Sequence, residues 1–168
     1  MTLEEIRELF EYDEWATNRI LESVSALSEQ DYRKDLGSSH GGMHTTLVHI
    51  CGADELWLGR WAGNPPAAML SVEDIPSLGI LRERWDKYRS GLGVFLGGLD
   101  EARLNAPHSY KDSRGNEYRQ ILSRLMLHKL NHASFHRGQV VAMLRQVGAV
   151  PKNTDLSAFY RETKKVPK

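Results

Sequence analysis

The stretch Leu127-His128-Lys129-Leu130-Asn131-His132-Ala133-Ser134-Phe135-His136-Arg137-Gly138-Gln139 gives the strongest indication of both fold and function, because three histidines recur in it at every fourth residue. Residues four apart lie on the same face of a helix. Seven histidines placed at random in this chain would give roughly 0.3 pairs at that spacing, whereas the sequence holds three, at 40/44, 128/132 and 132/136. The spacing therefore predicts a helix with a histidine face.

A histidine face of this kind can hold a transition metal, or it can consist of hydrogen-bonded core and surface histidines. Neutral imidazole is a good ligand for zinc, nickel, copper or iron, and neighbours on successive helical turns can reach one ion. A further ligand has to come from another helix, and His49 is the best candidate because it lies among apolar residues in Leu47-Val48-His49-Ile50. A stripe at four-residue spacing drifts by about 40° per step, so one ion does not easily reach all three histidines. Either His128 or His136 can therefore accompany His132.

The remaining histidines and the cysteine do not add a fourth ligand. We expect His40 and His44, at a loop-to-helix junction, to be exposed, and His108 to lie in a loop. Cys51 lies about 200° around the helix from His49, so we expect it to be a buried residue that points away from the site. Three nitrogen ligands leave an open coordination position, which is typical of catalytic metal sites. Because imidazole must be neutral to bind, the metal should be released below about pH 6.5.

Apolar residues recur with a helical period along most of the chain. Thr2 and Glu5 have the spacing of a capping box, and Gly148 is suited to the end of the last helix. The periodicity predicts long helices at residues 3–25, 43–61, 77–99 and 119–147. Short helices at 28–32 and 155–161, a loop at 33–42 and a small hairpin around 113–116 are predicted between and after them. The sequence thus predicts an all-α four-helix bundle, forming a single domain over residues 1–168.

Charge and composition exclude some functions and locations. Lys and Arg number 22, as do Asp and Glu, so the formal net charge is zero, which argues against a nucleic-acid partner. The single Cys51 fits a reducing compartment. The acidic start Met1-Thr2-Leu3-Glu4-Glu5 does not resemble a signal peptide, and no apolar run approaches the roughly 18 residues of a membrane span. We therefore expect a cytoplasmic protein without a membrane partner.

The histidine stretch resembles the last-helix motif of the DinB/YfiT-like superfamily, in which NH-x-x-x-HRGQ follows an apolar segment. Segments 46–57 and 10–19 are similar to the family's first-ligand helix and opening helix, and the tail matches in outline, so the resemblance covers nearly the whole chain. It implies an up-down-down-up four-helix bundle, for which the long connection at 62–76 is suited, and frequently a homodimer. It also implies a divalent metal, often nickel or zinc, on His49, His132 and His136, with His128 as a spectator.

Several residues beside the histidines admit two interpretations. Arg137 could bind a substrate anion, but we favour an ion pair with a carboxylate of the first helix such as Asp13 or Glu14. We expect Gly138 to permit close helix approach, since glycine within a helix otherwise costs stability. Asn131 and Gln139 could orient ligand imidazoles or serve as polar core residues. The four tryptophans are interpreted as core and rim packing.

Three functional hypotheses follow for a small-molecule substrate. Characterised members of the family that this chain resembles include thiol-dependent S-transferases and a mycothiol-dependent isomerase. The resemblance therefore implies, as the leading hypothesis, a metal-dependent enzyme that activates a low-molecular-weight thiol. A metal-dependent hydrolase would need the same site without a thiol. A stress-associated metal-binding protein without catalysis would instead have a closed site with a fourth protein ligand.

Overall fold

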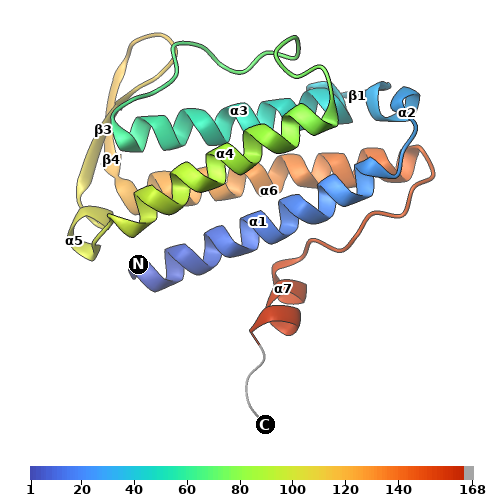
Figure 1. The fold of residues 1–168 in the computed structure, drawn as a ribbon. Coiled ribbons are helices and arrows are strands. Elements are labelled where there is room, and N and C mark those ends of the chain that lie inside the picture. Colours follow the sequence, from blue (N-terminus) through green and yellow to red (C-terminus); the bar gives the residue numbers. More distant parts are fainter. Residues whose placement is uncertain (165–168) are drawn as a thin grey trace.

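Four long helices form the body of the protein in the computed structural model, which describes residues 1–164 (Figure 1). They are α1 (Leu3–Ser25), α3 (Met43–Ala62), α4 (Leu78–Gly97) and α6 (Leu122–Gln146). Helices α1 and α6 run in one direction and α3 and α4 in the other, because the connection between α3 and α4 crosses the full length of the bundle (Figure 1). This up-down-down-up arrangement confirms the predicted all-α four-helix bundle.

The ends of the long helices coincide with local capping signals. The Thr2 side chain accepts a hydrogen bond from the Glu5 amide at 3.1 Å, and the Thr2 amide donates to the Glu5 carboxylate at 2.8 Å, which completes the predicted capping box. Helix α3 ends at Ala62 and is followed by Gly63, whose φ of 78° is the left-handed conformation that glycine adopts readily. Helix α4 begins after Ser77, which caps the Ile80 amide. These local signals explain why the predicted bounds of α1, α3 and α4 lie within two residues of the observed ones.

Shorter elements connect and flank the bundle. They are α2 (Glu29–Arg33), β1 (Asp35–Ser38), β2 (Gly41–Gly42), α5 (Glu101–Leu104), β3 (Pro107–Lys111), β4 (Glu117–Ile121) and α7 (Leu156–Thr163). Strands β3 and β4 form an antiparallel hairpin in which Tyr110 faces Tyr118. The predicted hairpin is therefore present but longer, and the last long helix begins at Leu122 instead of residue 119 because β4 pairs with β3 first. The segment predicted as a loop at 33–42 contains the small β1–β2 pair.

The packing leaves one continuous hydrophobic core between the helices. Helix α3 packs against α4 and α6, and α1 packs mainly against α6. Trp61 and Trp85 are fully buried, Trp57 is nearly so, and Trp15 packs at the rim against Phe159 of α7 at 5.7 Å. The predicted core and rim roles of the tryptophans are confirmed.

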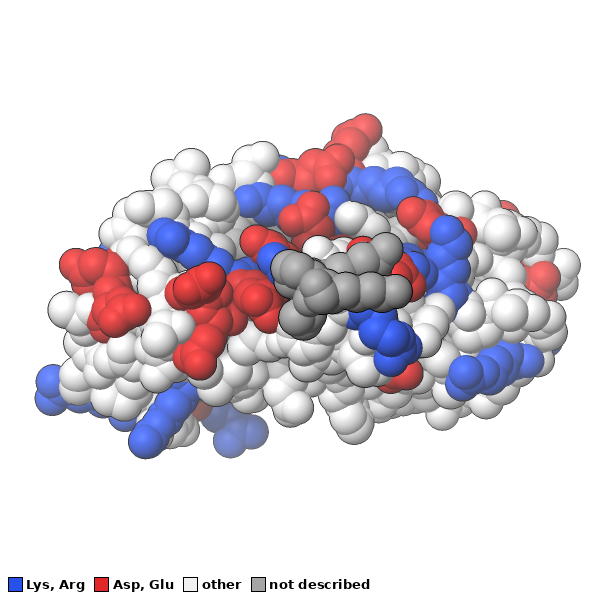
Figure 2. Space-filling model, turned by 90° about the horizontal axis from the view of Figure 1, so that it is seen from below, with Lys and Arg blue, Asp and Glu red and all other residues white. Residues whose placement is uncertain are grey.

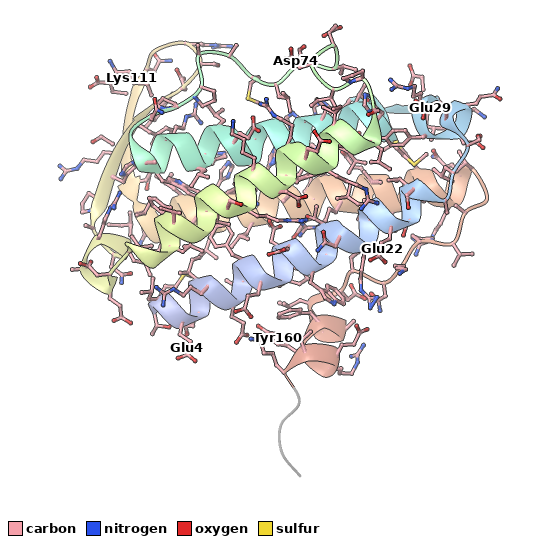
Figure 3. The ribbon with its side chains drawn as sticks, in the orientation of Figure 1. Glu4, Glu22, Glu29, Asp74, Lys111 and Tyr160 are labelled. Carbon is pink, nitrogen blue, oxygen red and sulfur yellow. The ribbon has the colours of Figure 1, made fainter. Side chains whose placement is uncertain are left out.

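The charged residues on the surface show no single-sign patch on the face in view. Figure 2 shows Lys and Arg side chains interspersed with Asp and Glu on that face. Glu4, Glu29, Asp74 and Lys111 are exposed, and Figure 3 shows them around the periphery of the bundle. Within residues 1–164, no helix is both long and apolar enough to cross a membrane.

Candidate metal centre

The three histidines predicted to bind a metal lie together between α3 and α6. The Nε2 atom of His49, on α3, is 3.0 Å from Nε2 of His132, on α6. The ring of His136, one turn after His132, has its centroid 4.7 Å from that of His49 and 4.4 Å from that of His132. The two helices position these rings because α3 and α6 pack closely along their lengths. That these residues bind a metal stays a prediction.

His40 joins this group, contrary to the expectation that it would be exposed outside the site. It lies in the two-residue turn between β1 and β2 and stacks on His49 with the ring centroids 3.9 Å apart. Its centroid is 5.1 Å from that of His136. One potential ligand atom from each of His40, His49 and His136 lies within 4.8 Å of the others. The centre therefore contains four histidines, and two overlapping triads share His49 and His136.

The other three histidines lie outside the centre. His44 is buried, with Nδ1 3.0 Å from the Tyr32 hydroxyl, so its predicted exposure is wrong. His108 lies on β3 and its Nε2 is 3.0 Å from the backbone carbonyl oxygen of Arg60. His128 is exposed, with its ring centroid 6.3 Å from that of His132. Its place at the edge fits the spectator role implied by the resemblance.

Gln139 fixes the orientation of His136. The Nδ1 atom of His136 lies 2.8 Å from the amide oxygen of Gln139. Because an amide oxygen only accepts hydrogen bonds, Nδ1 carries the proton and Nε2 presents its lone pair. The Gln139 amide nitrogen in turn donates to the Ser39 hydroxyl at 3.2 Å, which ties the turn that carries His40 to α6. Asn131 is exposed, so of the two candidate orienting residues only Gln139 contacts a histidine of the centre.

The electrostatics of the centre favour neutral imidazoles. Burial, followed by the neighbouring histidines, lowers the pKa of both His49 and His132 to about 4. Burial also lowers the pKa of His40. Nδ1 of His132 is buried and has no hydrogen-bond partner among the described residues. Neutral, converging nitrogen donors are the ligand set of borderline transition metals such as zinc and nickel, so the residues present fit a divalent ion of that class.

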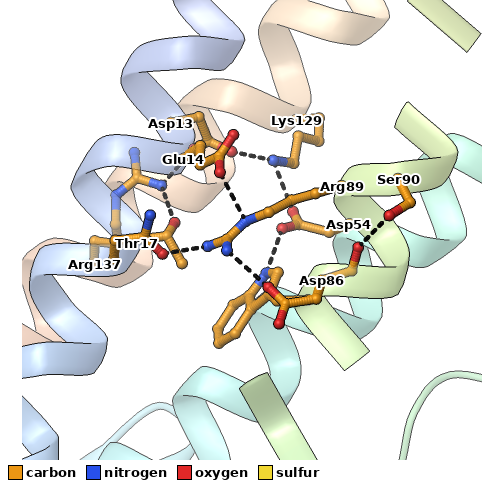
Figure 4. Close-up of polar contacts among 11 residues, drawn as sticks. Asp13, Glu14, Thr17, Asp54, Asp86, Arg89, Ser90, Lys129 and Arg137 are labelled. Atoms are coloured by element: carbon orange, nitrogen blue, oxygen red, sulfur yellow. Dashed lines mark hydrogen bonds and ion pairs between the residues drawn. The ribbon is translucent and has the colours of Figure 1, made fainter. Parts of the chain in front are cut away.

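A buried ion-pair network connects α6 to α1 and α3 (Figure 4). Asp13 of α1 forms ion pairs with both Lys129 and Arg137 of α6. Lys129 also lies 2.9 Å from a carboxylate oxygen of Asp54 on α3, and the Trp85 indole donates to Asp54 at 3.0 Å. Two carboxylates and two cations compensate each other. The favoured ion-pair interpretation of Arg137 is thus confirmed, with Asp13 as its partner.

The structure contradicts the role predicted for Gly138 and confirms the burial predicted for Cys51. Gly138 does not serve close helix approach, because a Cβ atom built there would meet nothing within 4 Å. Cys51 is buried as expected, and burial raises the pKa of its thiol. A buried, protonated thiol is neither a metal ligand nor a nucleophile. The chain therefore has no cysteine of its own that could act at the centre.

Aromatic residues form a wall beside the centre. Trp57 lies between His128 and Tyr110, with ring centroids 5.2 Å away on each side. The Arg60 guanidinium lies over the Trp57 ring at 4.7 Å. A separate cavity of about 330 Å³ opens between α1 and α4 and is lined in part by Asp13, Trp85 and Arg89, without any histidine. The aromatic wall, and not this cavity, adjoins the histidines.

Comparison with known proteins finds similarity over nearly the whole chain. The sequence profile of the DinB family matches residues 1–166. The chain is 25% identical over 161 residues to Protein DinB of Bacillus subtilis (strain 168), covering 93% of this chain and 94% of that protein. A crystal structure of a DinB-like protein from Bacillus cereus ATCC 10987 superposes with a TM-score of 0.70 at 17% identity, covering 90% of this chain and 97% of the other. The second likeness supports the fold alone.

Proposed function

This chain belongs to the DinB family, and on that premise we propose that it binds one divalent transition metal through His49, His132 and His136 and uses it in chemistry on a small molecule. The observation that carries the proposal is the convergence of these three rings, with the Nε2 atoms of His49 and His132 3.0 Å apart. The lowered pKa values of His49 and His132 support it, because only neutral imidazole binds a metal. Imidazole donors suit zinc, nickel, copper and iron, and of these we propose nickel or zinc, as the family resemblance implies.

We infer that the reaction is a thiol-dependent transfer to a small electrophile. A divalent ion at the centre would supply a Lewis acid that lowers the pKa of a coordinated thiol. The thiol has to come from a separate low-molecular-weight compound, because the single Cys51 is buried and protonated. The aromatic wall of Trp57, Tyr110 and His128 would bind an apolar part of the substrate beside the histidines. A cytoplasmic homodimer is the assembly and location that we propose.

Elemental analysis of protein purified without an affinity tag tests the metal proposal. Wild-type protein should contain about one equivalent of a divalent transition metal, as expected for one such site. His132→Ala should lose it, whereas His128→Ala, which removes an exposed histidine of the same helix face, should retain it. Circular dichroism of each variant checks that the fold is intact. Absence of metal in wild-type protein, even after reconstitution with nickel and zinc, would refute the proposal.

Binding of thiols separates a transferase from a metal-dependent hydrolase. The metal-loaded protein should bind a low-molecular-weight thiol in a calorimetric titration, and the metal-free protein should bind it much more weakly. A protein that retains its metal but shows no thiol affinity, while hydrolysing ester or amide substrates, would favour the hydrolase instead.

A further inference from the structure

We propose that His40 is a fourth metal ligand, which closes the coordination sphere of the three helix-borne histidines. The proposal rests on the proposed metal function and concerns the same centre. Helix ligands at this centre come from α3 and α6, whereas His40 comes from the turn between β1 and β2. One potential ligand atom of His40 lies within 4.8 Å of those of His49 and His136. Ligands of one zinc ion, each about 2.0–2.1 Å from it, lie at most about 4.2 Å apart, so a small movement would let His40 bind the same ion as His49 and His136.

The turn that carries His40 is built to hold that ring against the centre. The neighbouring Ser39 accepts a hydrogen bond from Gln139 at 3.2 Å, and the same Gln139 orients His136. The Thr45 hydroxyl, in the first turn of α3, donates to the His40 carbonyl. Gly41 has a φ of 84°, a left-handed conformation that permits the tight two-residue turn. His40 is therefore fixed on one side to α6 and on the other to α3.

The surroundings of the ring agree with a ligand and not with a surface residue. His40 is half-buried, stacks on His49 and lies edge-on to His136. No carboxylate is grouped with these histidines in the described part of the chain, so the ring has no ion-pair role there. Four imidazoles would complete a tetrahedral sphere.

A fourth ligand on a hairpin has a functional consequence. His49, His132 and His136 project from long helices, which move as units, but His40 projects from a two-residue turn. Displacing that one ring would open a coordination position without disturbing either helix. The centre would then be closed at rest, and an incoming thiol or other substrate ligand would take the place of His40.

The decisive experiment uses a cysteine at position 40 as a spectroscopic reporter. Thiolate bound to Co²⁺ gives a sulfur-to-cobalt charge-transfer band in the near ultraviolet. Co²⁺-loaded His40→Cys protein should show this band, whereas His128→Cys, with its thiol outside the cluster, should not. Wild-type protein is the second control, because its single Cys51 is buried away from the histidines. Cobalt-loaded His40→Cys protein without the band would overturn the proposal.

Metal affinity gives an independent measurement. Competition with a chromophoric zinc chelator should show that His40→Ala binds zinc at least about tenfold more weakly, since even the loss of a residue that only orients a ligand costs about 10- to 100-fold. His128→Ala should match the wild type. If His132→Ala abolishes binding while His40→Ala leaves it unchanged, the three-histidine site stands and the fourth ligand is refuted. Failure of wild-type protein to bind any metal refutes both.

Discussion

Gln139 acts on the centre through His136, and its substitution should weaken metal binding without unfolding the protein. The amide oxygen of Gln139 accepts a hydrogen bond from His136 Nδ1, with 2.8 Å between the two atoms. Loss of that contact frees the ring to rotate or change tautomer. Gln139→Ala should lower zinc affinity by about 10- to 100-fold in chelator competition. Asn131→Ala, on the same helix but exposed, serves as the control and should bind like wild type. Equal affinities for the two variants would show that Gln139 has no orienting role.

Protonation of the buried histidines should destabilise the metal-free protein at acid pH. The pKa values of His49 and His132 are about 4 in the folded protein, whereas an unfolded chain protonates histidine near 6.5. Between these values the unfolded state binds more protons than the folded state. The free energy of unfolding should therefore fall as the pH drops from about 6.5 to about 4, as measured by urea unfolding of metal-free protein at several pH values.

His49→Gln isolates this effect, because glutamine keeps a polar side chain but does not titrate. Its free energy of unfolding should fall less steeply than that of wild type over the same pH range. An equally steep fall would contradict the lowered pKa of His49.

The same lowered pKa values change the expectation for metal release. Release below about pH 6.5 assumed the ordinary pKa of histidine, whereas protons should compete with the metal at the buried rings only closer to pH 4.

At the scale of single elements, two glycines with different surroundings should respond in opposite directions to alanine. Gly42 lies in β2, directly before α3, and a Cβ atom there would lie 2.3 Å from the Lys34 carbonyl oxygen, so Gly42→Ala must push β2 away from the segment that leads into β1. We expect a loss of about 1–3 kcal/mol in the free energy of unfolding. Gly138→Ala, where nothing lies within 4 Å, should gain up to about 1 kcal/mol from helix propensity. Thermal unfolding of both variants tests these two predicted stability changes. A Gly138→Ala protein that is less stable than wild type would contradict the second prediction.

The elements show which features local sequence can predict. Helix α1 was predicted at its observed bounds because its capping box and apolar period lie within the helix itself. The hairpin β3–β4 was predicted too short, since the pairing of Tyr110 with Tyr118 is a contact between separate segments and β4 is exposed at all but its last residue. The start of α6 was misplaced for the same reason: residues 119–121 could belong to a helix locally but pair with β3 in the folded chain.

The candidate site shows the same division between local and tertiary information. His49, His132 and His136 could be found from helical spacing, an apolar context and the family resemblance, all of which are properties of the sequence. His40 could not, because its position depends on the pairing of β1 with β2 and on the contact between Ser39 and Gln139. Both His40 and His44 are predicted to be exposed because they lie at a loop-to-helix junction. The turn between β1 and β2 instead stacks His40 on His49, and His44 faces Tyr32 in the core.

At the scale of the whole molecule, the buried ion pairs connect α1, α3 and α6, and removal of a single partner should strongly destabilise the protein. Lys129 is fully buried between Asp13 and Asp54. Lys129→Met leaves two carboxylates without their shared cation, so we expect a loss of about 3–5 kcal/mol in the free energy of unfolding. Lys111→Met removes an exposed ion pair with Glu117 and should cost less than about 1 kcal/mol. Urea unfolding compares the two, and equal losses would mean that the network does not stabilise the bundle.

Metal binding should stabilise the entire fold, because the proposed ligands lie on two different helices. An ion that binds the folded protein alone, at a free concentration 100 times its dissociation constant, raises the free energy of unfolding by about 2.7 kcal/mol. We expect zinc or nickel to give a gain of this size in wild-type protein and a chelator to remove it. Magnesium should give none, since it prefers oxygen ligands. His132→Ala should be insensitive to all three treatments. An equal gain in wild type and His132→Ala would mean that the ion binds away from the histidines. That result would refute the proposed metal centre but not the four-helix fold.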